Sequence, residues 1–90
     1  MNKKRTRLEI IKDILEVLKN NKKARITHLI YKSNLSNNSI KPYIDELIKN
    51  KLVEVDFNEE KRVFRIAARG MGFLEEFNKI KIFTESYGLL

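Results

Sequence analysis

The sequence predicts one α+β domain, mostly helical, with three helices, a β-hairpin and a C-terminal helix in that order. Ninety residues is the length of a single small domain, and 42% apolar residues suffice for one core. Apolar residues recur at helical spacing up to about residue 48 and alternate with polar ones within 52–66. One proline and three glycines leave room only for short connections, so we expect residues 1–90 to form one domain.

Two helices are expected before residue 34. The first covers 6–20, where Thr6 and Glu9 have the spacing of a capping box. The second covers 28–33, and Thr27 precedes it as a candidate N-cap.

The start of the third helix is ambiguous, because Ser36, Asn38 and Ser39 can all cap it. With a cap at Ser36, Pro42 would fall in the second turn, where it removes a hydrogen bond and clashes with a carbonyl. We therefore expect either a start capped at Ser39 or a distorted first turn.

Alternating runs at 52–57 and 63–66, separated by the polar segment 58–61, predict a hairpin. A last helix is expected from about residue 71, followed by a tail over 84–90. Three helices, with a tight turn before the third, followed by a two-stranded wing form a winged helix-turn-helix arrangement.

The sequence resembles the winged-helix predicted transcriptional regulators of archaea, a group that includes the small Sso10a-type chromatin proteins. The resemblance covers about residues 8–77, and 27–35 is its most specific part. The matching residues are Asp13-Ile14-Leu15, the segment from Thr27 to Ser36, Tyr43, Leu47, Leu52-Val53-Glu54, Phe64-Arg65-Ile66, Gly70 and Phe73-Leu74. The resemblance implies DNA binding without catalysis, often as a dimer formed through the C-terminal helix.

The sequence departs from this family pattern at three positions. Lys51 stands where a glycine usually precedes the strand, so Asn50 or Lys51 must make that turn without glycine. Ala67 stands where a threonine usually caps the last helix, which removes a cap contributing about 1 kcal/mol. Pro42 lies in the helix expected to enter the DNA groove.

The distribution of charge favours a nucleic-acid partner. The net charge is +7, and residues 1–51 carry 13 Lys and Arg against 5 Asp and Glu, whereas residues 52–90 carry 6 against 7. A one-sided basic surface suits the phosphate backbone, although solubility alone is the alternative explanation.

Several classes of protein and site are not expected. The chain has no cysteine and one histidine, so we expect neither disulfides nor a metal site. Paired carboxylates and glycine-rich phosphate loops are missing too, so we expect no enzyme, cofactor or small-molecule ligand. No apolar run approaches the roughly 20 residues of a membrane span, and no secretory signal follows the basic N-terminus, so a cytoplasmic protein is expected.

Three groups of residues are candidates for binding double-stranded DNA. Asn37 and Asn38, at the start of the third helix, are candidates for reading bases, or they only make the turn. Basic clusters at 3–7 and 22–25 suit phosphate contacts, although the first could instead be a flexible arm. Two cations of the wing could enter a minor groove or hold phosphate. Besides the N-terminal cluster, the candidates are Lys22, Lys23, Arg25, Tyr31, Ser36, Asn37, Asn38, Lys41, Lys61 and Arg62.

Some of these candidates have a competing structural role. Ser36 is favoured as a helix cap over a DNA contact. Tyr31 either reaches a phosphate or belongs partly to the core. Because Glu59 and Glu60 at the wing tip would be repelled by DNA, we expect a weak wing contribution, chiefly from Arg62 and Arg65.

The segment 71–90 is more apolar than one domain needs, which indicates a homodimer interface or, alternatively, a tail folded back on its own core. Candidate interface residues are Phe73, Phe77, Ile80, Phe83 and Tyr87. The competing function for the whole chain is a winged-helix module that binds another protein, since this fold serves both purposes.

Overall fold

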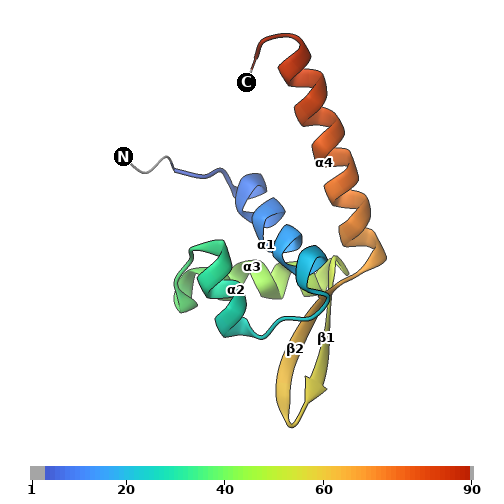
Figure 1. Ribbon diagram of the computed structural model, residues 1–90. Helices are drawn as coiled ribbons and strands as arrows, with labels where there is room; N and C mark the ends of the chain where they lie inside the picture. The colour runs from blue at the N-terminus through green and yellow to red at the C-terminus, as the bar shows by residue number, and fades with distance from the viewer. Residues whose placement is uncertain (1–3, 90) are drawn as a thin grey trace.

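The computed structural model describes residues 4–89, and it confirms the predicted order of elements (Figure 1). The elements are α1 (Arg7–Asn21), α2 (Ile26–Ser33), α3 (Asn37–Lys49), β1 (Val53–Asn58), β2 (Lys61–Ile66) and α4 (Ala68–Ser86). The strands pair antiparallel into a two-stranded hairpin, here called the wing, which extends away from the three-helix body (Figure 1).

The core lies between α1, α2, α3 and the base of the wing. Its largest fully buried side chain is Phe64 of β2, and leucines and isoleucines of the first three helices surround it. The fully buried apolar residues are Ile14, Leu15, Leu18, Leu29, Ile40, Ile44, Leu47, Val53 and Phe64. Almost all of them are positions at which the apolar periodicity predicts an inward side chain.

The predicted capping box of α1 is confirmed. Thr6 Oγ1 accepts a hydrogen bond from the Glu9 amide at 3.1 Å, and the Glu9 carboxylate accepts one from the Thr6 amide at 2.9 Å. The predicted cap of α2 is wrong. Arg25 is the N-cap, without a side-chain hydrogen bond, and Thr27 lies inside the helix.

Both alternatives predicted for α3 are wrong as well, because the helix starts early and its first turn is α-helical, not 3₁₀-like. Ser36 caps the helix, and its Oγ accepts a hydrogen bond from the Ser39 amide at 3.1 Å. Pro42 therefore lies in the second turn, where it cannot donate to the carbonyl of Asn38. Both residues are exposed, so water can bond the freed carbonyl, and this lowers the cost that had argued against a start at Asn37.

The turn from α3 to β1 is made without glycine, as expected. Lys51 adopts a φ of 63°. Its amide donates to the Ile48 carbonyl, and the Leu52 amide donates to the Leu47 carbonyl at 2.8 Å. These are the two hydrogen bonds of a Schellman motif, with lysine in the left-handed position that usually belongs to glycine.

The wing is longer and more tightly turned than the sequence predicts. Its register pairs Val53 with Ile66 and Asn58 with Lys61, so only Glu59 and Glu60 form the loop. Both have positive φ, 53° and 64°, as the central residues of a type I′ turn do. Neither is the Asn or Gly that such turns favour, so the tip carries backbone strain.

A short bridge joins the loop before α2 to the wing. The amide of Ala24 donates to the carbonyl of Phe64 at 2.9 Å, and the amide of Phe64 donates back at 2.8 Å. This pairing gives β2 a second backbone neighbour. It also holds the basic segment 22–25 against the wing.

The predicted bounds of the last helix are wrong at both ends. α4 begins at Ala68, three residues early, and residues 84–86 of the expected tail are helical. Its first turn is closely packed: a Cβ on Gly70 would lie 2.3 Å from the Leu52 carbonyl oxygen and 2.7 Å from Cγ1 of Ile66. Ala67 is the N-cap and makes no side-chain hydrogen bond, as the departure from the family pattern implies.

Beyond its first turns, α4 leaves the body of the molecule (Figure 1). Leu74 is buried and Phe73 packs against the core, whereas the residues after Phe77 are largely exposed. Within the described part of the chain, no helix combines the length and the apolarity needed to cross a membrane.

Candidate nucleic-acid interface

The first half of α3 presents polar side chains outward. Asn37, Asn38 and Lys41 are exposed, while Ile40 and Ile44 on the opposite side are buried. Ser36 is engaged locally, because its hydroxyl also lies 2.8 Å from the hydroxyl of Ser39. The cap role predicted for Ser36 is confirmed, and the amides of Asn37 and Asn38 are left as the outward polar groups.

A hollow between the start of α2 and the wing gathers three cations. Arg25, Lys61 and Arg62 line it, together with Ile26, Thr27 and Phe64. The guanidinium of Arg62 lies 5.4 Å from the centre of the Phe64 ring. The backbone bridge at Ala24 is the reason that Arg25 meets the wing cations, which follow it by more than thirty residues in the sequence.

Lys22 and Lys23, the other basic residues of segment 22–25, do not line the hollow. Lys22 and Lys23 are exposed, and Lys22 ends α1 with a φ of 57°. Lys23 lies close enough to Asp56 for its charge to help lower the pKa of that carboxyl, although the hydrogen bond from Arg65 is the larger cause. Lys23 thus lies near the acidic face of the wing, whereas Arg25 lines the hollow.

Arg65 is less available to a partner than the sequence suggests. Its Nε donates to Asp56 at 2.8 Å, and a second nitrogen lies 3.5 Å from Glu54. These carboxylates raise the pKa of the guanidinium, the hydrogen bond to Asp56 first. Two acidic neighbours offset its charge, so Arg62 is the stronger candidate of the pair expected to contribute from the wing.

Tyr31 is a surface residue. Its side chain is 79% exposed, which excludes the partly buried alternative, and the ammonium of Lys32 lies 5.8 Å from the ring centre. His28, the single histidine, is mostly buried, and its Nε2 has no hydrogen-bond partner among the described residues.

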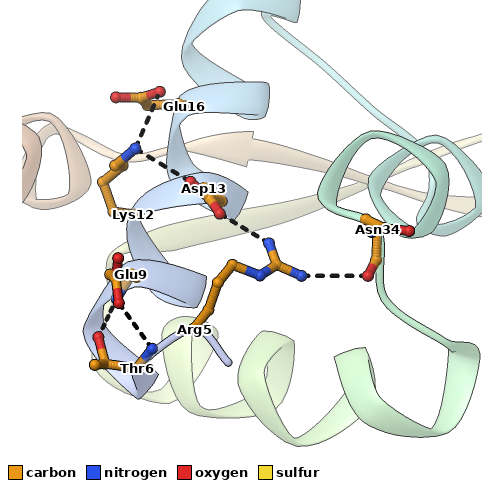
Figure 2. Close-up of polar contacts among 7 residues, drawn as sticks. All are labelled: Arg5, Thr6, Glu9, Lys12, Asp13, Glu16 and Asn34. Carbon is orange, nitrogen blue, oxygen red and sulfur yellow. Dashed lines mark hydrogen bonds and ion pairs between the residues drawn. The ribbon is translucent and has the colours of Figure 1, made fainter. Parts of the chain in front are cut away.

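The N-terminal basic cluster is partly used by the fold itself. Figure 2 shows that Arg5 donates to Asp13 of α1 at 2.8 Å and to the carbonyl of Asn34, in the turn before α3, at 3.2 Å. Arg7 pairs with Glu46 of α3. Lys4 is exposed, and Lys3, also a candidate, lies outside the described residues.

Sequence reasoning missed that Arg5 joins α1 to the turn before α3 through its hydrogen bonds to Asp13 and Asn34. Its partner Asn34 is 29 residues away and offers a backbone carbonyl, so no side-chain pattern marks the contact. The exposure of Phe57 also differs from the prediction. It is one of the alternating apolar residues of its strand, which are expected to point inward, but it is 71% exposed.

The candidate dimer residues of α4 divide into two groups. Phe73 packs on the core of its own domain, and the ring of Phe77 lies 6.1 Å from it. Ile80, Phe83 and Tyr87 are between 64% and 68% exposed, and the last two rings lie 5.0 Å apart. Among residues 4–89, no three His, Cys, Asp or Glu side chains are grouped so that they could hold a metal ion.

Comparison with known proteins gives a family and several structural relatives. A family model described as winged helix-turn-helix matches residues 4–85. A comparison with curated proteins gives no match. Among solved structures, the chain is similar to Sso10a-2, a DNA-binding protein from Sulfolobus solfataricus, with 27% identity and a TM-score of 0.74 over 93% of this chain and 90% of that chain.

Two further solved structures are similar at lower identity. One is a winged-helix DNA-binding protein from STIV, with 20% identity and a TM-score of 0.69 over 90% of this chain and 92% of that chain. The other is a MarR family transcriptional regulator from Silicibacter pomeroyi, with 21% identity and a TM-score of 0.69 over 90% and 58% of the two chains. These two likenesses concern the fold alone, but the family model spans nearly the whole chain, which therefore belongs to the winged helix-turn-helix family.

Proposed function

We propose that this protein binds double-stranded DNA without catalysing a reaction, as a transcriptional regulator or a chromatin-type protein of the cytoplasm. The observation that carries the proposal is the hollow in which Arg25, Lys61 and Arg62 converge beside the helix-turn-helix. Cations that replace condensed counterions supply most of the sequence-independent affinity for DNA. The similarity to Sso10a-2, which is described as a DNA-binding protein, supports the same function.

In this proposal α3 lies in the major groove with its N-terminal side chains on the bases. Asn37 and Asn38 point outward in the first turn, where an amide can pair with the edge of adenine. Lys41, one turn later, is placed for guanine or phosphate. Lys22, Lys23 and Tyr31 add contacts to the backbone without reading sequence.

The test is a titration of duplex DNA at two salt concentrations, roughly 50 and 200 mM. One variant replaces Arg25, Lys61 and Arg62 by glutamine. The matched control replaces Lys19, Lys49 and Arg69, which are exposed, lie outside the candidate set and carry the same total charge. We expect the hollow variant to bind more weakly and to lose roughly 0.9 of the log–log salt slope per lost phosphate contact, whereas the control changes little.

Equal losses in both triple variants would show that only net charge matters and that the hollow is not the contact. If the unchanged protein binds no duplex at low salt, DNA binding is wrong and the protein–protein module takes its place.

We propose further that the binding form is a homodimer joined through the distal half of α4. Ile80, Phe83 and Tyr87 are exposed on this half, and their spacings of three and four residues place them on one side of the helix. Exposed apolar groups gathered in this way mark an interface more often than a free surface. A two-fold dimer would present two α3 helices to two half-sites of the DNA.

Sedimentation equilibrium tests the dimer. Phe83→Glu is expected to give the monomer mass at a concentration where the unchanged protein is dimeric. Asn78→Glu adds the same charge at an exposed position two residues from Ile80, so it lies on a different side of the helix and should leave the dimer intact. A monomer mass for the unchanged protein at high concentration would rule the dimer out.

A further inference from the structure

The wing carries an exposed aromatic side chain near its tip. Phe57 is 71% exposed, although Val53 and Val55 earlier in the same strand are buried or partly buried. Residues two apart in a strand point to the same face, so the three form one apolar row that begins in the core and ends in solvent. No core contact explains an aromatic residue at the outer end of this row.

The two faces of the wing differ in charge. The register places Phe57 opposite Arg62, on the face that also carries Phe64 and Ile66. No carboxylate belongs to this face by strand alternation. Glu54 and Asp56 belong to the other face, where both bind Arg65. A polyanion should therefore be attracted more strongly to the face that carries Phe57 than to the face that carries the two carboxylates.

The face of Phe57 continues the cation-lined hollow. Arg62 and Phe64 of this face line the hollow together with Arg25 of the α2 N-terminus. The Arg62 guanidinium lies over the Phe64 ring, toward the base of the wing, so the Phe57 ring remains free nearer the tip. An exposed aromatic ring beside such cations matches a pattern common in nucleic-acid-binding surfaces, in which charge attracts the backbone and an apolar group contacts sugars or bases.

We propose that Phe57 is a DNA contact, with its ring in the minor groove while Arg62 holds the flanking phosphates. The inference rests on the proposed DNA binding and deepens it: the wing lies against the duplex with its apolar–basic face, not with its tip. Glu59 and Glu60 then stay outside the groove, because their carboxylates would be repelled by the phosphates. The contribution of the wing is thus apolar as well as electrostatic, and it is larger than its acidic tip suggests.

A fluorescence experiment tests the position of the ring. The chain has no tryptophan, so Phe57→Trp places a single reporter in the wing. Leu8→Trp places one at a similarly exposed site, 54% exposed, in the first turn of α1, the end away from the wing (Figure 1). On addition of duplex DNA, we expect the emission of Phe57→Trp to change and its quenching by acrylamide to fall, while Leu8→Trp does neither.

Salt-dependent titration distinguishes the ring from a charge contact. Phe57→Ala should weaken binding about tenfold and leave the log–log salt slope unchanged, because no charge is lost. Phe57→Leu, which keeps an apolar group, should retain most of the affinity. Arg62→Gln should reduce both the affinity and the slope, the latter by about 0.9. Unchanged far-UV circular dichroism confirms that each variant is folded.

The failure of this proposal differs from the failure of DNA binding itself. The proposed ring contact is wrong, and DNA binding stands, if the unchanged protein binds DNA but Phe57→Ala binds it equally well. The same conclusion follows if the emission of Phe57→Trp does not change when DNA is added. A shift of Phe57→Ala to a smaller sedimenting mass would assign the ring to a subunit interface and would also overturn the proposal. If no duplex is bound at low salt, both proposals fall.

Discussion

The helices α3 and α4 are both rich in apolar residues, but they use them differently. The apolar side chains of α3 face the core, with Ile40, Ile44 and Leu47 no more than 2% exposed. In α4, Leu74 is buried, but Ile80 and Phe83 are more than 60% exposed. The periodic pattern is local, whereas burial requires a facing partner. α3 packs against the rest of its own domain, whereas the distal half of α4 extends past the domain and has no facing surface there among the described residues.

The largest effect that should separate the two helices is the removal of a leucine or isoleucine side chain. Leu47→Ala leaves a cavity in the core and should lower the free energy of unfolding by about 2–5 kcal/mol. Ile80→Ala removes a side chain that is 65% exposed, so at a concentration where the protein is monomeric the change should stay within about 0.5 kcal/mol. Urea unfolding followed by circular dichroism measures both.

If Ile80→Ala lowers the free energy of unfolding strongly under monomeric conditions, distal α4 packs on its own domain as α3 does, and the two helices do not differ. If the free energy falls only where the protein is dimeric, the second subunit covers distal α4, and the difference between the two helices holds.

The next effect concerns how α4 is docked at its start. A Cβ at Gly70 meets the carbonyl oxygen of Leu52, a backbone atom that cannot easily move, so Gly70→Ala should cost about 1–3 kcal/mol. Gly72→Ala is the matched control two residues away, where a Cβ meets nothing within 4 Å. Alanine there should stabilise the helix by about 0.5–1 kcal/mol. If the unfolding temperature rose in both variants or fell in both, the close approach of Gly70 to the Leu52 carbonyl would be contradicted.

These two glycines illustrate what can be predicted from sequence. The helices and the hairpin are predictable, because their apolar periodicity depends on neighbours a few residues apart. The close packing of Gly70 in α4 on the carbonyl of Leu52, in the turn between α3 and β1, is not predictable, because these residues are distant in the sequence. The pairing of Ala24 with Phe64, just before α2, is non-local in the same way.

The candidate site, too, is only partly predictable from the sequence. The basic and amide residue types could be identified from composition and position, but the convergence of Arg25 with Lys61 and Arg62 could not. It follows from a backbone bridge between residues forty positions apart. Pro42 misled the prediction for α3, because its cost depends on whether the Asn38 carbonyl reaches water, and that is a tertiary property.

The outward face of α3 and the loop that follows α1 should affect DNA binding in different ways. Asn38→Ala should reduce discrimination between a selected sequence and random DNA, by about 1–3 kcal/mol if the amide reads a base. Lys23→Ala should weaken binding to all sequences alike, because a phosphate contact carries no sequence information. Competition titrations with selected and random duplexes measure both. Equal losses on both duplexes for Asn38→Ala would mean that its amide does not read a base.

The smallest expected effect lies at the N-termini of the two helices. The hydroxyl of Ser36 caps α3, whereas Ala67 at the same position of α4 has no group that can accept a hydrogen bond from the first turn. Ser36→Ala should therefore lower the free energy of unfolding by about 1 kcal/mol, and Ala67→Ser should raise it by a similar or smaller amount. The serine adds one oxygen at a site that is 8% exposed, so its gain depends on the hydroxyl reaching the amide of Gly70. Thermal unfolding without DNA measures both. If only the loss at Ser36 is observed, the close packing of Gly70 already holds the first turn of α4 in place, and docking rather than capping sets where that helix begins.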